Sequence, residues 1–337
     1  MPAKSIFALM VPARWIVCAY ALAIAICISA WFPSCATDAV TNQNVSLQSP
    51  AHWTTLTPSE YIGQDRKIPF FKLRTENGSV AYLAVINFKD GNYKLVPFFN
   101  ESTGTTSDAV RRHRAILGIN GGYFNLSDGQ STCYVVINGK NQCEPKHNKA
   151  LIDNPKLKPY LGTIFNRSEL RILRNGNGNT RMEVSKHTKP IPPGWLLESS
   201  LQAGPELLPE LTAQQEVFVR TNPDGTTTDS IGSRRPAART ACGITPDGHV
   251  VLLCVASKGQ DEFSSGISLE ELAQILKLLG CDKAINFDGG TSTTMSVCPG
   301  EDSSGQGCEV KQVCGKTPEK LIKSGLLVVR RGKSKPN

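Results

Sequence analysis

Two short apolar segments, far apart in the chain, each end in a polar residue followed by Gly-Gly. Residues 115–122 end in Asn-Gly-Gly, and residues 284–290 end in Asp-Gly-Gly. Short apolar runs bounded by glycine are typical of buried strands. Glycines at a strand end also let the backbone turn sharply and a ligand approach closely. The sequence therefore predicts two strand ends that bring Asn120 and Asp288 to one pocket.

Strand patterns dominate the first half of the chain. Residues 80–88 and 93–99 lie on either side of an Asp-Gly-Asn turn, which predicts a hairpin. A helix over 106–114 follows, with Ser107 as the expected N-cap. Further strands are expected at 132–137, 160–165 and 169–173.

The second half has clearer boundaries. Residues 239–244 and 250–256 flank a Pro-Asp-Gly turn and predict a second hairpin. Ser268 and Glu271 form a capping box at the start of a helix that Gly280 ends. The last strands are expected at 284–287 and 326–329. Together these patterns predict a single strand-rich α+β domain, with a mixed β-sheet core and a few packed helices.

The first 35 residues read as an export segment. Lys4 and Arg14 precede an uncharged apolar run over residues 15–32, which is typical of a secretory signal or a single membrane anchor. Lipid attachment at Cys35 is an alternative. We therefore expect an exported protein, periplasmic or extracellular, that contacts the membrane through this segment. The expected organisation is a signal peptide or anchor at 1–35, a polar linker at 36–60, the folded domain at 61–332 and a basic tail at 333–337.

Eight of the 11 cysteines follow residue 35. An even number in an exported chain predicts a disulfide framework. Cys133 and Cys143 flank one predicted turn, and Cys242 and Cys254 flank another, so these are the local pairs we expect. Buried free thiols are the alternative. Because the chain has no CxxC and no pair of histidines at ligand spacing, no metal site is expected.

The formal net charge of +8 is spread along the chain. Its basic clusters are not interleaved with aromatic residues, so nucleic acid is not expected as a partner. A mild positive balance instead suits an anionic substrate or an anionic surface.

Several residues near the two strand ends could bind or transform a ligand. Asp288 would expose a carboxylate beside small residues, and Asn120 and Asn286 offer amide groups. Hydroxyl and main-chain N–H groups over 289–292 could bind phosphate oxygens. A Gly-Pro turn presents Glu206. Ordinary turns with a solvated carboxylate, and a surface glutamate, are the structural alternatives.

Two arginines precede the second hairpin. Arg239 begins its first strand and Arg235 lies four residues earlier. An arginine held on a strand can bind phosphate bidentately, and a structural ion pair is the alternative.

Five motifs in a fixed order give the chain a family resemblance. They are Asn-Gly-Gly-Tyr-Phe at 120–124, Ala-Gly-Pro-x-Leu at 203–207, Arg-Thr-Ala-Cys-Gly-Ile at 239–244, Gly-Ile-Ser-Leu-Glu-Glu-Leu-Ala at 266–273 and Asn-Phe-Asp-Gly-Gly-x-Ser at 286–292. In this order, residues 80–330 resemble the phosphodiester glycosidase family. The order of several motifs is far more specific than any one of them.

The resemblance implies a hydrolase that cleaves the bond between an anomeric carbon and the phosphate of a sugar-1-phosphodiester. A sugar and a phosphomonoester would be released, and no cofactor is required. The implied catalytic residues are Asp288 as the carboxylate, Arg239 as the phosphate ligand and Glu206 as partner acid or base. The implied substrate-binding residues are Asn120, Gly121, Gly122, Arg235, Asn286, Gly289, Gly290, Thr291 and Ser292.

Two other classes of function remain open at this point. One is a non-catalytic glycan-binding or envelope polysaccharide-assembly protein that keeps the same fold. The other is a metallohydrolase in which Asp288 binds a divalent cation.

Overall fold

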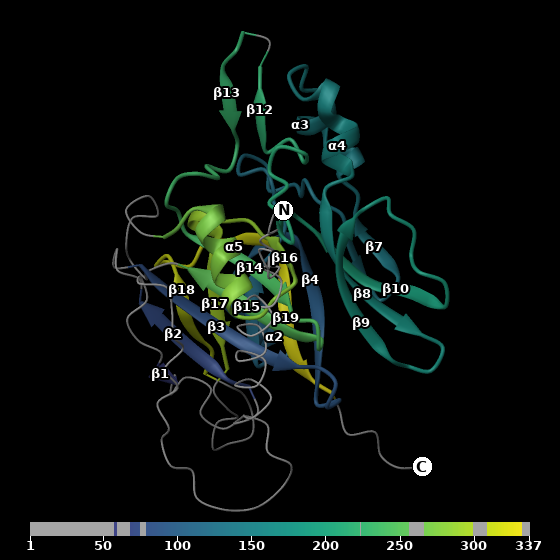
Figure 1. Ribbon diagram of the computed structural model, residues 1–337, viewed down its shortest axis with the longest axis vertical. Coiled ribbons are helices and arrows are strands. Elements are labelled where there is room, and N and C mark those ends of the chain that lie inside the picture. Colours follow the sequence, from purple (N-terminus) through teal and green to yellow (C-terminus); the bar gives the residue numbers. More distant parts are fainter. Residues whose placement is uncertain are drawn as a thin grey trace, which may run out of the picture. The chain divides into compact units, whose positions relative to one another are not determined.

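The computed structural model describes residues 57–58, 68–74, 79–222, 224–255, 266–298 and 309–331 (Figure 1). All of them belong to the unit that spans Asn44–Asn337. The predicted export segment, most of the predicted linker and the basic tail therefore lie outside the described residues. Of the helices within the described ranges, none has the length and apolar character needed to cross a bilayer.

Two antiparallel sheets enclose the main core. The first sheet has the strand order β1 (Thr57–Pro58), β2 (Phe70–Arg74), β3 (Val80–Asn87), β15 (His249–Val255), β14 (Arg239–Ile244), β16 (Lys283–Asn286) and β11 (Glu206–Leu208). The second has the order β18 (Lys311–Gly315), β17 (Thr294–Val297), β5 (Leu117–Asn120), β19 (Ile322–Arg330) and β4 (Tyr93–Gly104). Both sheets contribute buried side chains to one apolar cluster, which includes Leu252, Ile119 and Leu326.

A third antiparallel sheet adds to the same core. Its order is β7 (Lys140–Cys143), β6 (Val135–Ile137), β10 (Trp195–Gln202), β8 (Ser168–Asn175) and β9 (Thr180–Lys186). Leu170 and Leu201 from this sheet belong to the main cluster. The two-stranded ribbon of β12 (Val219–Thr221) and β13 (Thr227–Asp229) and the short helices α3 (Lys149–Ile152) and α4 (Leu161–Phe165) complete this part of the chain. The short 3-10 turns are η2 (Pro145–His147), η3 (Lys158–Tyr160) and η4 (Gly290–Ser292).

Two helices cover the outer faces of the first two sheets. Helix α5 (Leu269–Leu278) packs Leu272 and Leu276 into a cluster with Leu253 of β15, and Figure 1 shows it lying across β14 and β15. Helix α2 (Thr106–Arg112) packs Ala109 and Val110 against Leu327 of β19. Strand β3 is therefore buried along most of both faces, which explains its nearly continuous apolar sequence.

Helix α5 forms where the sequence predicts it. The Ser268 hydroxyl accepts a hydrogen bond from the Glu271 amide (3.2 Å), and the Glu271 carboxylate accepts one from the Ser268 amide (2.7 Å). This is the expected capping box. Gly280, with φ of +81°, follows the last turn and ends the helix as predicted.

The fold is mainly β, and the expectation of a mixed sheet is wrong, because every strand pairing among the described residues is antiparallel. The first predicted hairpin is also wrong. Strand β3 pairs with β2 and β15, whereas β4 pairs with β19 in the other sheet. The Asp-Gly-Asn turn exists, but it passes the chain from one sheet to the other.

Three local predictions have different outcomes. The second hairpin, β14 with β15, is confirmed. Residues 160–165 are helical rather than extended, since α4 occupies Leu161–Phe165. The N-cap of α2 is Thr105, whose hydroxyl accepts from the Asp108 amide, and not Ser107.

The two predicted disulfides are absent. Cys133, Cys143, Cys242 and Cys254 are all free thiols. The register explains this, because Cys143 lies opposite Val135 and Cys242 lies opposite Leu252, so each predicted pair is offset by two residues. Cys298 is disulfide-bonded.

Replacing Ser268 with alanine should lower the free energy of unfolding by about 1 kcal/mol, because the first turn of α5 loses its cap. Urea denaturation followed by circular dichroism measures this change. Glu271→Gln keeps a side-chain acceptor for the Ser268 amide and should lose less. Equal stability of wild type and Ser268→Ala would contradict the importance of this cap.

Candidate functional site

The structure brings the two Gly-Gly strand ends together. The Asn120 side-chain amide donates a hydrogen bond to the Asp288 carbonyl (2.6 Å), and the Asp288 amide donates to the Gly121 carbonyl (2.8 Å). Asn120 is 1% exposed, and its oxygen accepts from the Thr240 hydroxyl (2.7 Å) and the Thr294 amide (3.0 Å). One buried side chain thus joins β5 to β14, β17 and the loop after β16.

Asn286 lies in a second group of hydrogen bonds beside the first. Its amide nitrogen donates to the Tyr123 hydroxyl (2.8 Å) and the Gly204 carbonyl (3.2 Å), and the Tyr123 hydroxyl donates to the same carbonyl (2.8 Å). The Asn286 side-chain oxygen is buried and has no hydrogen-bond partner among the described residues. A buried acceptor without a donor is costly, so this oxygen calls for an ordered water or a ligand hydroxyl.

Packing, rather than turn geometry, explains the glycines at 121 and 122. A Cβ atom on Gly121 would lie 2.6 Å from Leu201 Cδ2, and one on Gly122 would lie 2.8 Å from the Gln202 carbonyl oxygen. A Cβ on Gly289 would lie 2.7 Å from the Ala238 carbonyl oxygen. These glycines allow strand ends from three sheets to approach closely.

The turn after Asp288 uses some of its own donors. Gly290 has φ of +60°, and its amide donates to the Ala238 carbonyl (2.8 Å). Ser292 is buried and its amide donates to the Gly289 carbonyl (3.2 Å), whereas Thr291 is partly exposed. The buried Thr293 hydroxyl has no partner within the described part of the chain. Of the predicted hydroxyl donors, Thr291 is the more accessible.

The Arg239 guanidinium is buried and binds backbone carbonyls. Its guanidinium donates to the carbonyls of Ile267 (2.9 Å), Ile231 (3.0 Å), Gly232 (2.6 Å) and Arg235 (2.9 Å). The residue is 2% exposed, and four of its five N–H donors are occupied. Its predicted role as phosphate ligand stays a prediction, with one donor left for it. Arg235 lies exposed on the preceding loop.

Glu206 begins β11 opposite Ile285 of β16 and is half-buried. Burial raises the pKa of its carboxyl, while the ammonium groups of Lys283 and Lys186 oppose this rise. A raised pKa suits a general acid. Glu216 and Lys189 also act on Glu206. Its role as partner of Asp288 stays a prediction.

Glu216 is a buried carboxylate that the sequence did not reveal. It accepts hydrogen bonds from the Ser168 amide (2.9 Å), the Ser168 hydroxyl (2.7 Å), the Glu206 amide (3.0 Å) and Thr212, and it pairs with the Lys186 ammonium (2.7 Å). Burial alone would raise its pKa, but Lys186 and these donors together hold the pKa below its usual value. The Glu216 carboxylate also occupies the space that a Cβ atom on Gly204 would need. It therefore positions the segment whose carbonyl Tyr123 and Asn286 share.

Arg167 is the second residue that the sequence did not reveal. Its guanidinium lies 3.6 Å from the centroid of the Phe218 ring, and Phe218 lies 5.5 Å from Tyr123. Nε donates to the Glu216 carbonyl (3.0 Å) and Nη2 to the Val217 carbonyl (3.3 Å), whereas Nη1 makes no hydrogen bond to a described residue. Arg167 precedes β8 without a motif around it, so no pattern marked it.

The charges of Asp288 and Arg167 act on the same two groups, the Tyr123 hydroxyl and the Cys133 thiol. Burial raises the pKa of the Tyr123 hydroxyl well above its usual value, with Asp288 adding to this and Arg167 opposing it. Burial likewise raises the pKa of the Cys133 thiol to about 12, where Arg167 opposes and Asp288 adds. Both groups are therefore protonated at neutral pH, which excludes Cys133 as a thiolate nucleophile.

No cluster of three or more His, Cys, Asp or Glu side chains suited to a metal ion occurs in the ranges that the structure describes. The site thus consists of the Asp288 carboxylate, an arginine, two protonated groups and an unpaired amide oxygen. Such a set can bind an anion and stabilise a developing positive charge on a ligand.

The mainly β fold and the meeting of the two Gly-Gly strand ends agree with the family resemblance noted from the motifs. The phosphodiester glycosidase family model matches residues 113–329. The chain belongs to the phosphodiester glycosidase family, and the resemblance noted from its motifs is confirmed.

Two solved structures share the fold. The catalytic domain of zebrafish N-acetylglucosamine-1-phosphodiester alpha-N-acetylglucosaminidase, auto-inhibited by its pro-peptide, has a TM-score of 0.51 and 14% identity, over 83% of this chain and 89% of that one. A hypothetical protein from Synechocystis has a TM-score of 0.53 and 15% identity over 84% of this chain, and the chain spans 64% of that protein. Sequence comparison with curated proteins gave no significant match.

Replacing Glu216 with glutamine should lower the free energy of unfolding at pH 7 by about 2 kcal/mol, because a paired buried carboxylate is lost. Since the folded-state pKa of Glu216 is depressed, its stabilisation is present above the unfolded pKa and is lost as pH falls through the folded value. The difference between wild type and variant should therefore shrink below about pH 4.5. Denaturation at a series of pH values measures it, with the exposed Glu210→Gln as control. A difference that stays constant down to pH 3 would contradict this account.

Proposed function

We propose that this chain hydrolyses the bond between the anomeric carbon of a sugar and a phosphodiester oxygen, releasing the sugar and a phosphomonoester. Family membership supports the reaction class. The observation that carries the proposal is the junction at which Asn120 and Asp288 meet, with a carboxylate-bearing residue at the end of β16 held by backbone bonds to β5.

The chemistry of the leaving group fits this set of residues. A phosphate monoester has a second pKa near 6, so it departs with less help from a general acid than a sugar hydroxyl does. The carboxylate of Asp288 would stabilise an oxocarbenium-like sugar or direct the attacking water. The buried oxygen of Asn286 would accept a hydrogen bond from a sugar hydroxyl.

Phosphate needs a cation, and Arg167 suits this role better than Arg239. Arg167 keeps its Nη1 donors unbonded to the described residues, and it acts on the same Tyr123 and Cys133 as Asp288 does. Arg239 contributes mainly by holding the loop before β14. Glu206, with its raised pKa, is proposed as the second acid or base.

The proposed location is outside the cytoplasm. The apolar segment at 15–32 would direct export, and it would either be removed or remain as an anchor. The disulfide at Cys298 supports an oxidising compartment.

Asp288→Asn should lower the release of free sugar from a sugar-1-phosphodiester such as UDP-N-acetylglucosamine by about 100-fold or more, because the carboxylate charge is lost. Its melting temperature should stay close to that of wild type. Asp282→Asn, an exposed aspartate just before β16, is the matched control and should keep full activity. Retention of a tenth of the activity by Asp288→Asn would remove Asp288 from the proposed role. Absence of sugar release by wild type would favour a non-catalytic glycan-binding protein, and sensitivity to chelators would favour a metallohydrolase.

Lysine variants of Arg167 and Arg239 should differ in their effects on KM and on stability. Arg167→Lys should raise KM for the phosphodiester by about tenfold, because a planar guanidinium binds phosphate better than an ammonium does. Its loss of stability should be smaller than that of Arg239→Lys, because two carbonyls rather than four lose a donor. Arg239→Lys should instead lower the free energy of unfolding by about 2 kcal/mol or more, since buried carbonyls lose their donors. Steady-state kinetics together with urea denaturation of both variants distinguish the roles. A KM effect of Arg239→Lys alone would restore the role first predicted for Arg239.

A further inference from the structure

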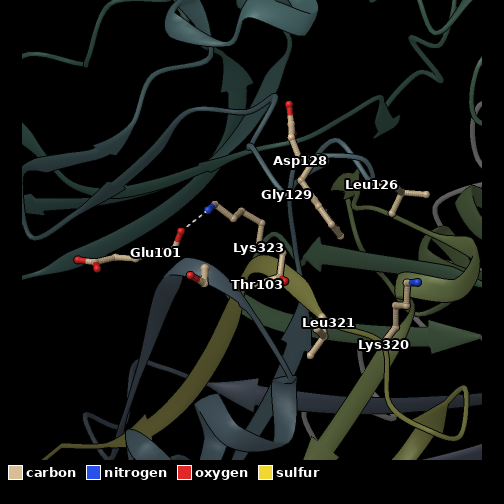
Figure 2. A pocket seen from close by; sticks show the side chains of 10 residues that line it. Glu101, Thr103, Leu126, Asp128, Gly129, Lys320, Leu321 and Lys323 are labelled. Atoms are coloured by element: carbon tan, nitrogen blue, oxygen red, sulfur yellow. Dashed lines mark hydrogen bonds between the residues drawn. The ribbon is translucent and has the colours of Figure 1, made fainter.

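A pocket of about 370 Å³ lies beside the candidate site and is not explained by it. Three segments line it, namely the end of β4 at 101–103, the loop at 124–129 after the first Gly-Gly, and residues 320–323 at the start of β19. Figure 2 shows Lys323 among these segments, with its ammonium group directed toward the Glu101 carbonyl. The pocket thus brings together parts of the chain more than 200 residues apart in sequence.

Lys323 is a buried cation without a carboxylate partner. The residue is 8% exposed, its Nζ donates to the Glu101 carbonyl (2.6 Å), and it lies 5.0 Å from the centroid of the Phe99 ring. Among the described residues, no carboxylate approaches it within ion-pair distance. An ammonium has three N–H donors, and burying one without a counter-ion is unfavourable. The pocket therefore presents a positive charge that an anion from solution would satisfy.

The acidic residues that line the pocket do not meet this need. Figure 2 shows that the carboxylates of Glu101 and Asp128 point away from the Lys323 ammonium. The rim is apolar and basic, because Leu126 is 73% exposed and Leu321 is 49% exposed, and Phe124 and the exposed Lys320 lie with them in the lining. Exposed leucines of this kind suit the C–H face of a sugar ring, and the ammonium suits a phosphate.

Hydrogen bonds connect the segment next to Lys323 to the candidate site. Ser324, the neighbour of Lys323, accepts from the Gly121 amide through its carbonyl (2.9 Å) and from the Gly122 amide through its hydroxyl (3.2 Å). The carbonyl of Gly121 in turn accepts from the Asp288 amide (2.8 Å). A ligand in the pocket would therefore touch segments that also shape the candidate site.

From these observations we propose that the pocket binds the phosphate group of a phosphorylated sugar, with Lys323 as the buried cation. Arg167, the phosphate ligand of the proposed function, does not line this pocket, so the pocket is a separate binding site and does not rest on that function. The contact is reversible and noncovalent, and its strength falls as salt screens the charge.

Isothermal titration calorimetry of the full chain with glucose 6-phosphate, inorganic phosphate and glucose tests the proposal. Wild type should bind glucose 6-phosphate more tightly than inorganic phosphate, and glucose weakly or not at all. Lys323→Met should weaken glucose 6-phosphate binding at least tenfold, and its melting temperature should not fall. Lys316→Met, an exposed lysine outside the pocket, should bind as wild type does.

A second pair of variants leaves Lys323 in place. Leu321→Glu sets a carboxylate at the exposed rim and should weaken binding severalfold at low salt, whereas Leu321→Gln should have a much smaller effect. Asp288→Asn should retain binding. Unchanged affinity in both Lys323→Met and Leu321→Glu would overturn the proposal, and so would loss of binding in Asp288→Asn alone. Binding that depends on Lys323, in a protein that releases no sugar from a phosphodiester, would support the pocket and overturn the proposed hydrolysis.

Discussion

The side-chain amide of Asn120 is the contact on which the site depends. It donates to the Asp288 carbonyl and accepts from the Thr240 hydroxyl and the Thr294 amide, all inside a nearly water-free junction. An apolar side chain of similar size could fill this space but would leave two donors and one acceptor unsatisfied. The two sheets can therefore approach at this point only with a side chain that both donates and accepts. The position of Asp288 follows from that approach, since its own backbone is bonded on both sides to β5 and the turn after it.

Around this junction, two charged residues act through the backbone. Glu216 gathers the segments at 168, 206 and 212, and Arg167 fixes the carbonyls of Glu216 and Val217. Their combined effect is to hold Gly204, whose carbonyl receives both Tyr123 and Asn286. The third sheet thus supports the site, although neither partner of the Asn120–Asp288 contact belongs to it. The buried charges of Glu216 and Arg167 are better explained by their fixing one arrangement of these segments than by a net gain in stability.

The sequence predicted what is local and what has a motif. The capping box of α5, the turn between β14 and β15 and the meeting of Asn120 with Asp288 all depend on short patterns. Pairing between distant strands does not. The turn at 90–92 was found, but the choice between a hairpin and a change of sheet depends on whether β19 offers β4 a better edge, and that information lies 230 residues further along the chain.

The same limit explains the cysteines and the missed charges. A shift of two residues in register separates Cys242 from the position opposite Cys254, and spacing alone does not fix register. Glu216 and Arg167 lie in turn-rich or irregular stretches, where single charged residues usually face solvent. Their burial follows from the packing of β8 and β10 against the first sheet, which no local pattern encodes.

The protonation states around Asp288 agree with the proposed reaction. Because burial keeps Tyr123 and Cys133 neutral, neither adds negative charge next to the aspartate, and the positive charge of Arg167 acts on the same two groups. A phosphate that leaves the anomeric carbon gains negative charge, and it would do so facing a cation and neutral groups rather than anions. The sugar gains positive charge, which the carboxylate of Asp288 would stabilise. Separation of one anion from one cation across neutral side chains thus matches the two charges that develop when a sugar–phosphate bond breaks.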